Sequence, residues 1–208
     1  PPAQITGPDQ MPESLPLPAV GAPPAPEMNA LWQPGERGAL KMLNAFFDES
    51  LQGYADNRDI PGGVTTSRLS PHLRWGEISP QRVYASLGEA RLDTRDGHKF
   101  LSEMGWREFS YYLLYHYPDM PERCLQNKFE AFPWRDAPED LEAWKQGRTG
   151  YPIVDAGMRE LARTGFMHNR TRMITASFLT KHLLIDWRKG EKWFWECLAD
   201  ADPANNVA

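Results

Sequence analysis

The densest group of chemically capable side chains lies in residues 148–187. Arg170 and Arg172 follow Asn169, a favourable N-cap, so both fall in the first turn of a predicted helix. A helix N-terminus already disfavours positive charge, whereas its free N–H groups attract anions. Two arginines there favour an anion from outside the chain, with phosphate as the natural candidate. Salt bridges to carboxylates elsewhere in the fold explain the pattern equally well.

A carboxylate and an indole share one face of another predicted helix. Glu103 and Trp106 are three residues apart within 96–117, which places them on the same side. This pair suits a flat heterocycle that stacks on the ring and hydrogen-bonds to the acid. The alternative, and the commoner situation, is a core tryptophan beside a surface glutamate.

Hydroxyl groups cluster around Arg68 in the stretch 65–70. Such hydroxyls, together with backbone N–H groups, can hydrogen-bond a phosphate. They are equally suited to capping a helix. The hydroxyl residues are Thr65, Thr66, Ser67 and Ser70.

Helical periodicity predicts the elements that position these groups. We expect an all-α fold of about seven helices, since no strand alternation exceeds a few residues and no repeat occurs. Pro152 and Gly165 suit the start and stop of a helix over 152–163, and Ser79 is placed to cap another. Apolar residues on several sides predict that a helix over 169–184 is largely buried. The other predicted helices cover 35–52, 80 onward, 96–117, 138–146 and 190–198.

Composition sets further limits. The formal net charge is −5, yet residues 144–192 hold ten Lys or Arg against four Asp or Glu. A basic segment in an acidic chain is a possible footprint for a polyanion, and an ordinary solvated face gives the same count. Cys124 and Cys197 match no metal spacing and predict reduced thiols. No apolar run is long enough for a membrane span, and we expect a cytoplasmic protein.

Two regions differ in composition. Residues 1–34 hold ten of the nineteen prolines and predict a Pro-rich interdomain linker, which implies a preceding domain. Residues 35–208 form the predicted helical domain. They contain no Gly-rich dinucleotide fingerprint, Walker loop, nucleophile elbow or zinc signature, so generic motifs name no reaction and no metal site.

Several segments together resemble the flavin-binding helical domain of the DNA photolyase/cryptochrome family, closest to the class I cyclobutane pyrimidine dimer photolyases. They occur in the family's order and cover nearly everything after Pro34. The resemblance implies a multi-helix FAD-binding domain, here incomplete at its C-terminus and without the family's N-terminal α/β antenna domain. The matching pieces are YADNRDIP, TSRLSPHLRWGEISP, FLSEMGWREF, AWKQGRTGYPIVDAGMRELARTGFMHNRTRMITASFLTKHLLIDWRKGEKWF and DADPANN.

The activity that the resemblance implies is light-dependent repair of pyrimidine dimers in UV-damaged DNA. In the family, a U-shaped FAD sits in a cavity of the helical domain. The excited, reduced flavin passes an electron to the dimer, which splits and returns it. The damaged dinucleotide is flipped from the duplex into the cavity. A monomer without membrane association is expected.

The resemblance also implies roles for residues at matching positions. Glu103 resembles the carboxylate that hydrogen-bonds the dimer bases, and Trp106 the indole that packs against them. Asn169 and Met173 resemble further contacts at the flavin–lesion boundary. The expected phosphate contacts are Arg107 and Arg170. The expected FAD contacts are Tyr54, Thr66, Ser67, Arg68, Leu69, Ser70, Arg172 paired with Asp200, Asp202, and Asn206 next to flavin N5.

Trp187 and Trp134 match the middle and outer members of the family's photoreducing tryptophan chain. The inner member follows the Asn-Asn pair in the family, and this sequence stops at Ala208 before it, so poor photoreduction is expected. Pro203 also departs from the family's wording. The alternative function is a cryptochrome-type blue-light photoreceptor that binds FAD without repair, and Trp106 and Met173 favour repair. A flavin-free helical domain that binds DNA weakly is a third reading.

Overall fold

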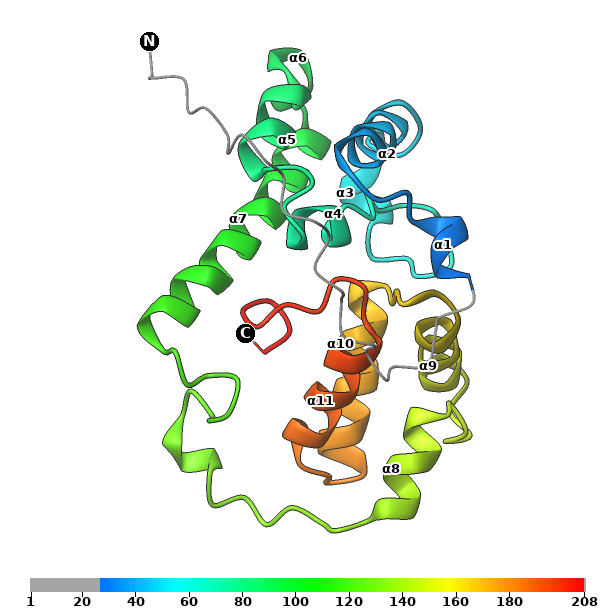
Figure 1. Cartoon of the computed structure of the whole chain (residues 1–208), viewed down its shortest axis with the longest axis vertical. Coiled ribbons are helices and arrows are strands. Elements are labelled where there is room, and N and C mark those ends of the chain that lie inside the picture. The colour runs from blue at the N-terminus through cyan, green and yellow to red at the C-terminus, as the bar shows by residue number, and fades with distance from the viewer. Residues whose placement is uncertain (1–26, 208) are drawn as a thin grey trace, which may run out of the picture.

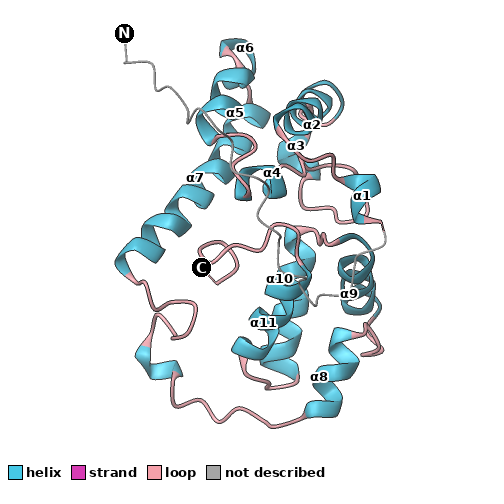
Figure 2. Ribbon diagram, viewed as in Figure 1, coloured by secondary structure: helices cyan, strands magenta, loops and turns pink. Residues whose placement is uncertain are grey.

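The computed structural model describes residues 27–207, and within this part of the chain there are helices and loops but no strand (Figures 1 and 2). The predicted all-α fold is confirmed. Among residues 27–207, seven helices have eight residues or more, in agreement with the predicted number. The α-helices are α1 (Met28–Leu31), α2 (Glu36–Glu49), α3 (Tyr54–Asn57), α4 (Ser70–Arg74), α5 (Pro80–Leu87), α6 (Glu89–Leu92), α7 (Arg95–His116), α8 (Pro138–Lys145), α9 (Pro152–Thr164), α10 (Asn169–Ser177) and α11 (Trp187–Cys197).

The helices gather around two apolar clusters. The first joins α2, α3, α5 and the start of α7 through buried residues such as Leu43, Phe46 and Phe100. The second joins α8, α9 and α11 through buried residues such as Trp144 and Met158. The 22-residue helix α7 runs away from the first cluster, and the chain then travels around the edge of the molecule to α8 (Figure 1). The loop after α11 lies between α7 and α10.

Several predicted helix ends are confirmed by their capping bonds. The Ser79 hydroxyl accepts the backbone N–H of Arg82 at 3.1 Å at the start of α5. Gly165 ends α9 with φ of 68°, a left-handed conformation that glycine adopts at little cost. The last long helix begins at Trp187 and not at residue 190, because the Asp186 carboxylate accepts the N–H of Arg188 and caps it there.

The helix predicted over 169–184 needs correction. His168, and not Asn169, supplies the N-cap, and α10 ends at Ser177, where a five-residue π-helical turn, Phe178–His182, follows. The expected burial on several sides is wrong for the first turns, because Met173 is 54 % exposed. The buried side of α10 is instead formed by Thr171 and Thr175, whose small side chains allow a close approach to α9.

The end of the predicted linker is packed against the helical domain. The Glu27 backbone N–H donates to Arg163 O at 3.0 Å, and their side chains form an ion pair at 2.6 Å. Trp32 is buried, with its ring against those of His72 and Phe166. Residues 1–26 of the predicted linker lie outside the described residues.

Candidate functional site

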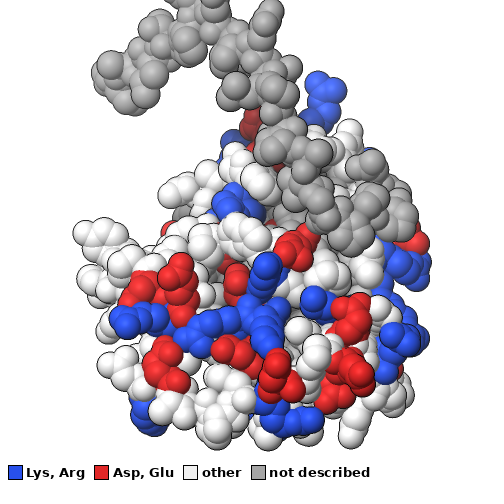
Figure 3. Space-filling view, turned by 60° about the horizontal axis from the view of Figure 1, so that its bottom comes forward, with Lys and Arg blue, Asp and Glu red and all other residues white. Residues whose placement is uncertain are grey.

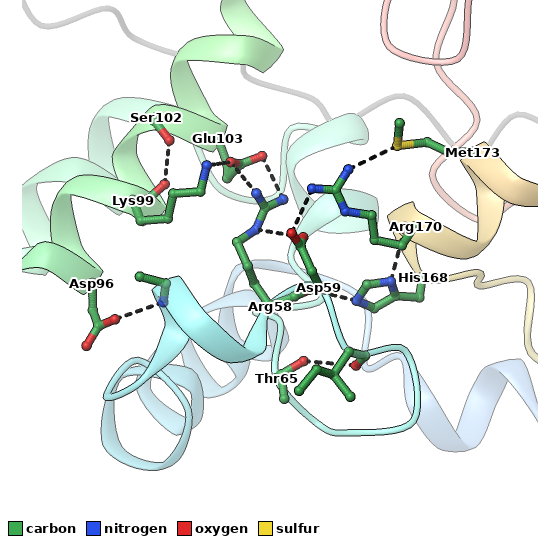
Figure 4. Close-up of polar contacts among 12 residues, drawn as sticks. Arg58, Asp59, Thr65, Asp96, Lys99, Ser102, Glu103, His168, Arg170 and Met173 are labelled. Carbon is green, nitrogen blue, oxygen red and sulfur yellow. Dashed lines mark hydrogen bonds and ion pairs between the residues drawn. The ribbon is translucent and has the colours of Figure 1, made fainter.

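Glu103 is held by a two-point ion pair with Arg58 (Figure 4). The Nη1 and Nη2 atoms of Arg58 donate to the two carboxylate oxygens at 2.6 and 2.9 Å. Lys99, one turn earlier on α7, adds a third contact at 3.1 Å. Arg58 is buried and packs over the Tyr54 ring at 5.7 Å, so its guanidinium has little freedom. The carboxylate therefore has one preferred orientation on α7.

The segment that carries Arg58 is tied to the start of α10 by two contacts. The Asp59 carboxylate pairs with Arg170 at 2.7 Å, and this pairing lowers the pKa of Asp59. The buried His168 ring lies 2.9 Å from Arg58 O through Nε2 and 3.1 Å from the Arg170 backbone nitrogen through Nδ1. Figure 4 shows Arg58 and Asp59, which follow α3, converging with Glu103 of α7 and with His168 and Arg170 at the start of α10.

Trp106 lies one turn beyond Glu103 and is 62 % exposed. The alternative of a core tryptophan is therefore wrong. Its ring meets Phe109 edge-on, which leaves a face of the indole accessible. Asn169 and Met173 are also exposed at the start of α10, where the Met173 sulfur lies 3.5 Å from Arg170 Nη1. A carboxylate, an indole and a thioether are thus accessible around one network of charged groups.

Arg172 and Asp200 form the ion pair that the sequence predicts, at 2.8 Å. The Asp200 side chain is only 5 % exposed, and its other oxygen, Oδ1, has no hydrogen-bond partner among residues 27–207. The Nδ2 atom of Asn206 is likewise buried without a partner in that range. One acceptor and one donor are therefore available in the loop that follows α11.

Asp202 is buried in the same loop, where its Oδ1 accepts the backbone N–H groups of Ala204 and Asn205. The Tyr111 hydroxyl donates to its other oxygen. Burial by itself would raise the pKa of Asp202, but these hydrogen bonds outweigh it and lower the pKa. Asp202 therefore stays ionised and organises the turn around Pro203.

Arg74 and Trp75 at the end of α4 hold the loop from the other side. Arg74 Nε donates to Ala201 O, and Trp75 Nε1 donates to Ala199 O at 2.9 Å. These contacts join residues more than 120 positions apart. The loop with Asp200 is thus fixed between α4, α7 and α10.

The hydroxyl-rich segment 65–70 contains a strained residue. Arg68 has φ of +51°, in the left-handed region that non-glycine residues rarely adopt. Its guanidinium lies 5.2 Å from the Phe166 ring, which Arg172 also approaches, at 5.9 Å. The Ser67 hydroxyl accepts the N–H of Leu69. No side-chain cap is made to α4, so the capping alternative is wrong for this described helix.

The remaining predicted site residues lie in several different places in the fold. Tyr54 is buried under Arg58, and burial raises its pKa to about 12. Arg107 pairs with its neighbour Glu108 at 2.7 Å and lies over the Tyr111 ring. Thr66 and Leu69 belong to the loop before α4, and Ser70 is its first residue.

The two predicted electron-carrying tryptophans border the loop before α11. Trp187 is the first residue of α11, and its Nε1 is buried without a partner among the described residues. The N–H of Arg135, next to Trp134, donates to Leu184 O at 2.7 Å. Trp187 also lines a cavity of about 260 Å³ with Glu191 and Asn206. The electron-transfer role of Trp134 and Trp187 stays a prediction.

Five of the ten basic residues of segment 144–192 form ion pairs with carboxylates. The face in Figure 3 shows Lys and Arg interleaved with Asp and Glu. Both Arg170 and Arg172, which the sequence left open between an outside anion and internal salt bridges, form internal ion pairs. Further pairs join Arg163–Glu27, Arg188–Glu130 and Lys189–Asp136. The carboxylates Glu27, Asp59, Glu130, Asp136 and Asp200 lie outside the segment, so these five ion pairs offset much of its charge excess.

Sequence reasoning missed three residues that organise the site, namely Arg58, Asp59 and His168. Arg58 and Asp59 stand in a loop, where no periodicity indicates which way a side chain points. His168 precedes the helix by one residue, and its only sequence signal is that an acceptor side chain there can cap the helix. Their partners are 45 to 111 residues away.

Comparison with known proteins gives the context for this geometry. Residues 100–208 match the family model described as the FAD binding domain of DNA photolyase. A deoxyribodipyrimidine photo-lyase of Agrobacterium fabrum is 51 % identical over the whole chain, which covers 45 % of that protein. Cryptochrome-2 of Arabidopsis thaliana is 44 % identical over 82 % of the chain and 29 % of its own length.

A solved structure agrees with these matches. The class III photolyase of Agrobacterium tumefaciens superposes with a TM-score of 0.85 at 54 % identity, covering 88 % of this chain and 38 % of that one. The class I assignment within the family stays a prediction. The chain spans less than half the length of these relatives. The family model nevertheless matches more than half of its residues, and the chain therefore belongs to the family of the FAD-binding domain of DNA photolyase.

Proposed function

We propose that the natural protein containing this chain repairs cyclobutane pyrimidine dimers in DNA by a light-dependent reaction. The observation that carries the proposal is the two-point ion pair of Arg58 with Glu103, which orients a carboxylate beside the exposed Trp106. A pyrimidine offers N–H donors to a carboxylate and a flat face to an indole. The same two groups thus complement a base that has left the stack.

FAD is the cofactor of this family's domain, and the residues present fit it. The edge of a flavin ring carries both N–H donors and carbonyl or nitrogen acceptors. The unpartnered Asp200 Oδ1 and Asn206 Nδ2 supply one acceptor and one donor in a buried loop. Arg172 lies beside Asp200 through their ion pair. We propose that these three residues hold the ring and that Asp202 keeps their loop in shape.

The segment around Arg68 is the proposed holder of the FAD phosphates and ribityl chain. Its left-handed backbone at Arg68 and its partly accessible hydroxyl residues are typical of a segment shaped for a ligand and not for helix packing. When bound, FAD supplies the photoexcited electron donor for repair. The protein's own part is to orient the dimer and to fix it near the flavin.

The DNA side of the proposal uses the exposed groups at the start of α10 and on α7. Arg170 is 39 % exposed at its side chain, so one face remains accessible beside Asp59. Arg107 is the second candidate for a backbone phosphate. Asn169 and Met173 would border the flipped dinucleotide. We propose a monomer in a reducing cytoplasm, where the free thiols of Cys124 and Cys197 are stable.

The test is a repair assay with reduced FAD on an oligonucleotide that contains one thymine dimer. We expect blue light to restore the thymines, and Glu103→Gln to lower the yield at least about tenfold because a charged acceptor is lost. Trp106→Ala should remove the preference for damaged DNA. Trp195→Ala, an exposed tryptophan on α11, is the matched control and should keep both properties. Absence of repair by the wild-type protein with reduced FAD would contradict the proposal.

The second candidate function is a blue-light photoreceptor, which the match to a plant cryptochrome favours. A photoreceptor would use the same flavin-binding residues but would not need to recognise a lesion. Trp106→Ala distinguishes the two functions, because it should leave a receptor's light response unchanged. Equal affinity of the wild-type protein for damaged and undamaged DNA would favour the receptor.

A further inference from the structure

His168 has one tautomer that fits its surroundings. Its Nδ1 lies 3.1 Å from the backbone nitrogen of Arg170, which can only donate, so Nδ1 must accept. Its Nε2 lies 2.9 Å from the carbonyl oxygen of Arg58, which can only accept, so Nε2 must carry the proton. The ring is therefore neutral and protonated on Nε2. In this form it caps α10 and anchors the Arg58 carbonyl at once.

The anchored carbonyl belongs to the residue whose side chain orients Glu103. The Arg58 N–H donates to Tyr54 O at the end of α3, and its carbonyl is fixed by His168. With both ends of this residue held, its guanidinium reaches Glu103 in the two-point geometry. A shift of the carbonyl would move both N–H groups relative to the carboxylate.

The neighbouring ion pair of Asp59 with Arg170 is the weaker of the two anchors. Both of its side chains are more than a third exposed, at 47 % and 39 %, so water screens their attraction. His168 is only 4 % exposed, and loss of its hydrogen bond would leave a carbonyl without a partner in a dry setting. The histidine therefore dominates the placement of Arg58.

We propose that His168 is a positioning residue for the lesion-binding carboxylate: it joins α10 to the Arg58 segment, and Arg58 in turn orients Glu103. The inference rests on the proposed function, in which Glu103 contacts the dimer. His168 itself makes no contact with the lesion. It acts on Glu103 through the backbone carbonyl and the guanidinium of Arg58.

Two substitutions test the two hydrogen bonds of the His168 ring separately. In His168→Asn the side-chain oxygen can take the place of Nδ1 and cap α10, but nothing reaches the Arg58 carbonyl. In His168→Gln the longer amide can donate to that carbonyl at the expense of the cap. His98→Asn, at an exposed histidine on α7, is the matched control.

The first readout is a double-mutant cycle on unfolding, which needs no activity. We expect His168→Asn and Glu103→Gln to be coupled by about fivefold in the unfolding equilibrium constant, as for residues in one network. His168→Gln should keep the wild-type effect of Glu103→Gln, and His98→Asn should show no coupling. Additivity of the His168→Asn cycle within about twofold would overturn the inference.

The second readout is the repair yield per absorbed photon in the natural protein loaded with FAD. His168→Asn should lower this yield about tenfold, because the Glu103 carboxylate is misplaced. His168→Gln should keep most of the wild-type yield. In a protein that already carries Glu103→Gln, His168→Asn should lower the repair yield no further. If the wild-type protein repairs nothing, the proposed function fails, while the unfolding cycle still decides the positioning role.

A third measurement needs no variant, and it covers the case in which His168→Asn does not fold. Nitrogen NMR of the labelled wild-type protein reports which ring nitrogen carries the proton. A neutral ring protonated on Nε2 at neutral pH is expected. The Nδ1 tautomer would remove both hydrogen bonds, and a charged ring would remove the one that Nδ1 accepts from Arg170. Either result would overturn the inference that His168 joins α10 to the Arg58 segment.

Discussion

Arg58 and Glu103, 45 residues apart in the sequence, meet through two parallel N–H···O bonds of 2.6 and 2.9 Å. The arginine is buried, whereas the carboxylate is partly accessible from the side of α7 that carries Trp106. A fork of this kind fixes both position and plane of the carboxylate, which a single ammonium group cannot do. The pair thus converts a surface glutamate into an oriented one.

The first prediction concerns the fork itself. Arg58→Lys keeps the charge but offers only a point contact, and it leaves part of the buried space unfilled. We expect the free energy of unfolding to fall by about 2 kcal/mol, measured by urea denaturation. Arg95→Lys is the matched control, because Arg95 makes the same two-point contact with Asp56 on the surface. Equal losses for both variants would show that burial of Arg58 adds nothing.

The second prediction concerns the ion pair of Arg172 with Asp200. The side chains are 21 % and 5 % exposed, so Asp200→Asn leaves a largely buried guanidinium without its counter-ion. We expect unfolding to become easier by about 3 kcal/mol and FAD retention after desalting to be lost. Asp119→Asn breaks an exposed pair with Arg123 and should change stability by less than about 0.5 kcal/mol. Retained FAD in a folded Asp200→Asn protein would contradict the proposed role.

The contrast between these two sites shows how far the sequence could be read. Helical spacing predicts that Glu103 and Trp106 share a face, and local capping residues predict the start of α5 and the end of α9, because these signals depend on neighbours in the chain. The placement of Arg58 beside Glu103 depends on how α3 packs against α7. No local pattern encodes a contact of that range, so the residues that orient Glu103 were not predicted.

The exposure of Met173 likewise depends on packing between helices, which a local pattern does not encode. Apolar residues on several sides of 169–184 predicted burial, but the threonines take the inner side of α10. Threonine is small enough to let the α9 backbone approach, whereas methionine is not. Shape, and not hydrophobicity, therefore decides which side of α10 faces α9.

The third prediction uses that close approach. A Cβ at Gly157 on α9 would collide with the Thr171 methyl group, whereas a Cβ at Gly105 on α7 meets nothing within 4 Å. Alanine is a better helix former by about 1 kcal/mol, so Gly105→Ala should raise the free energy of unfolding by up to that amount. Gly157→Ala should lower it by about 1–3 kcal/mol because α10 must shift. Stabilisation by both would mean that α9 and α10 are less tightly packed than the structure indicates.

The last prediction is a pH dependence that His168 alone should produce. Burial lowers the pKa of His168 below its ordinary value of 6.5, and the charges of Arg58 and Arg170 act in the same direction. Asp59 and the Arg58 carbonyl oppose them without reversing the shift. A proton on Nδ1 would also remove the cap on α10. The unfolded chain therefore binds this proton at a higher pH than the folded protein does.

The sign follows from this difference. The contribution of His168 to stability is fully present above the unfolded pKa, near 6.5, and is lost as the pH falls through the lower, folded pKa. We expect the difference in unfolding free energy between wild type and His168→Asn to shrink between about pH 7 and pH 5. The hydrogen bond from Arg170 lowers the pKa of the neighbouring Asp59, so this carboxylate stays ionised over the same range. Parallel stability curves over this range would show that His168 is not held neutral by its surroundings.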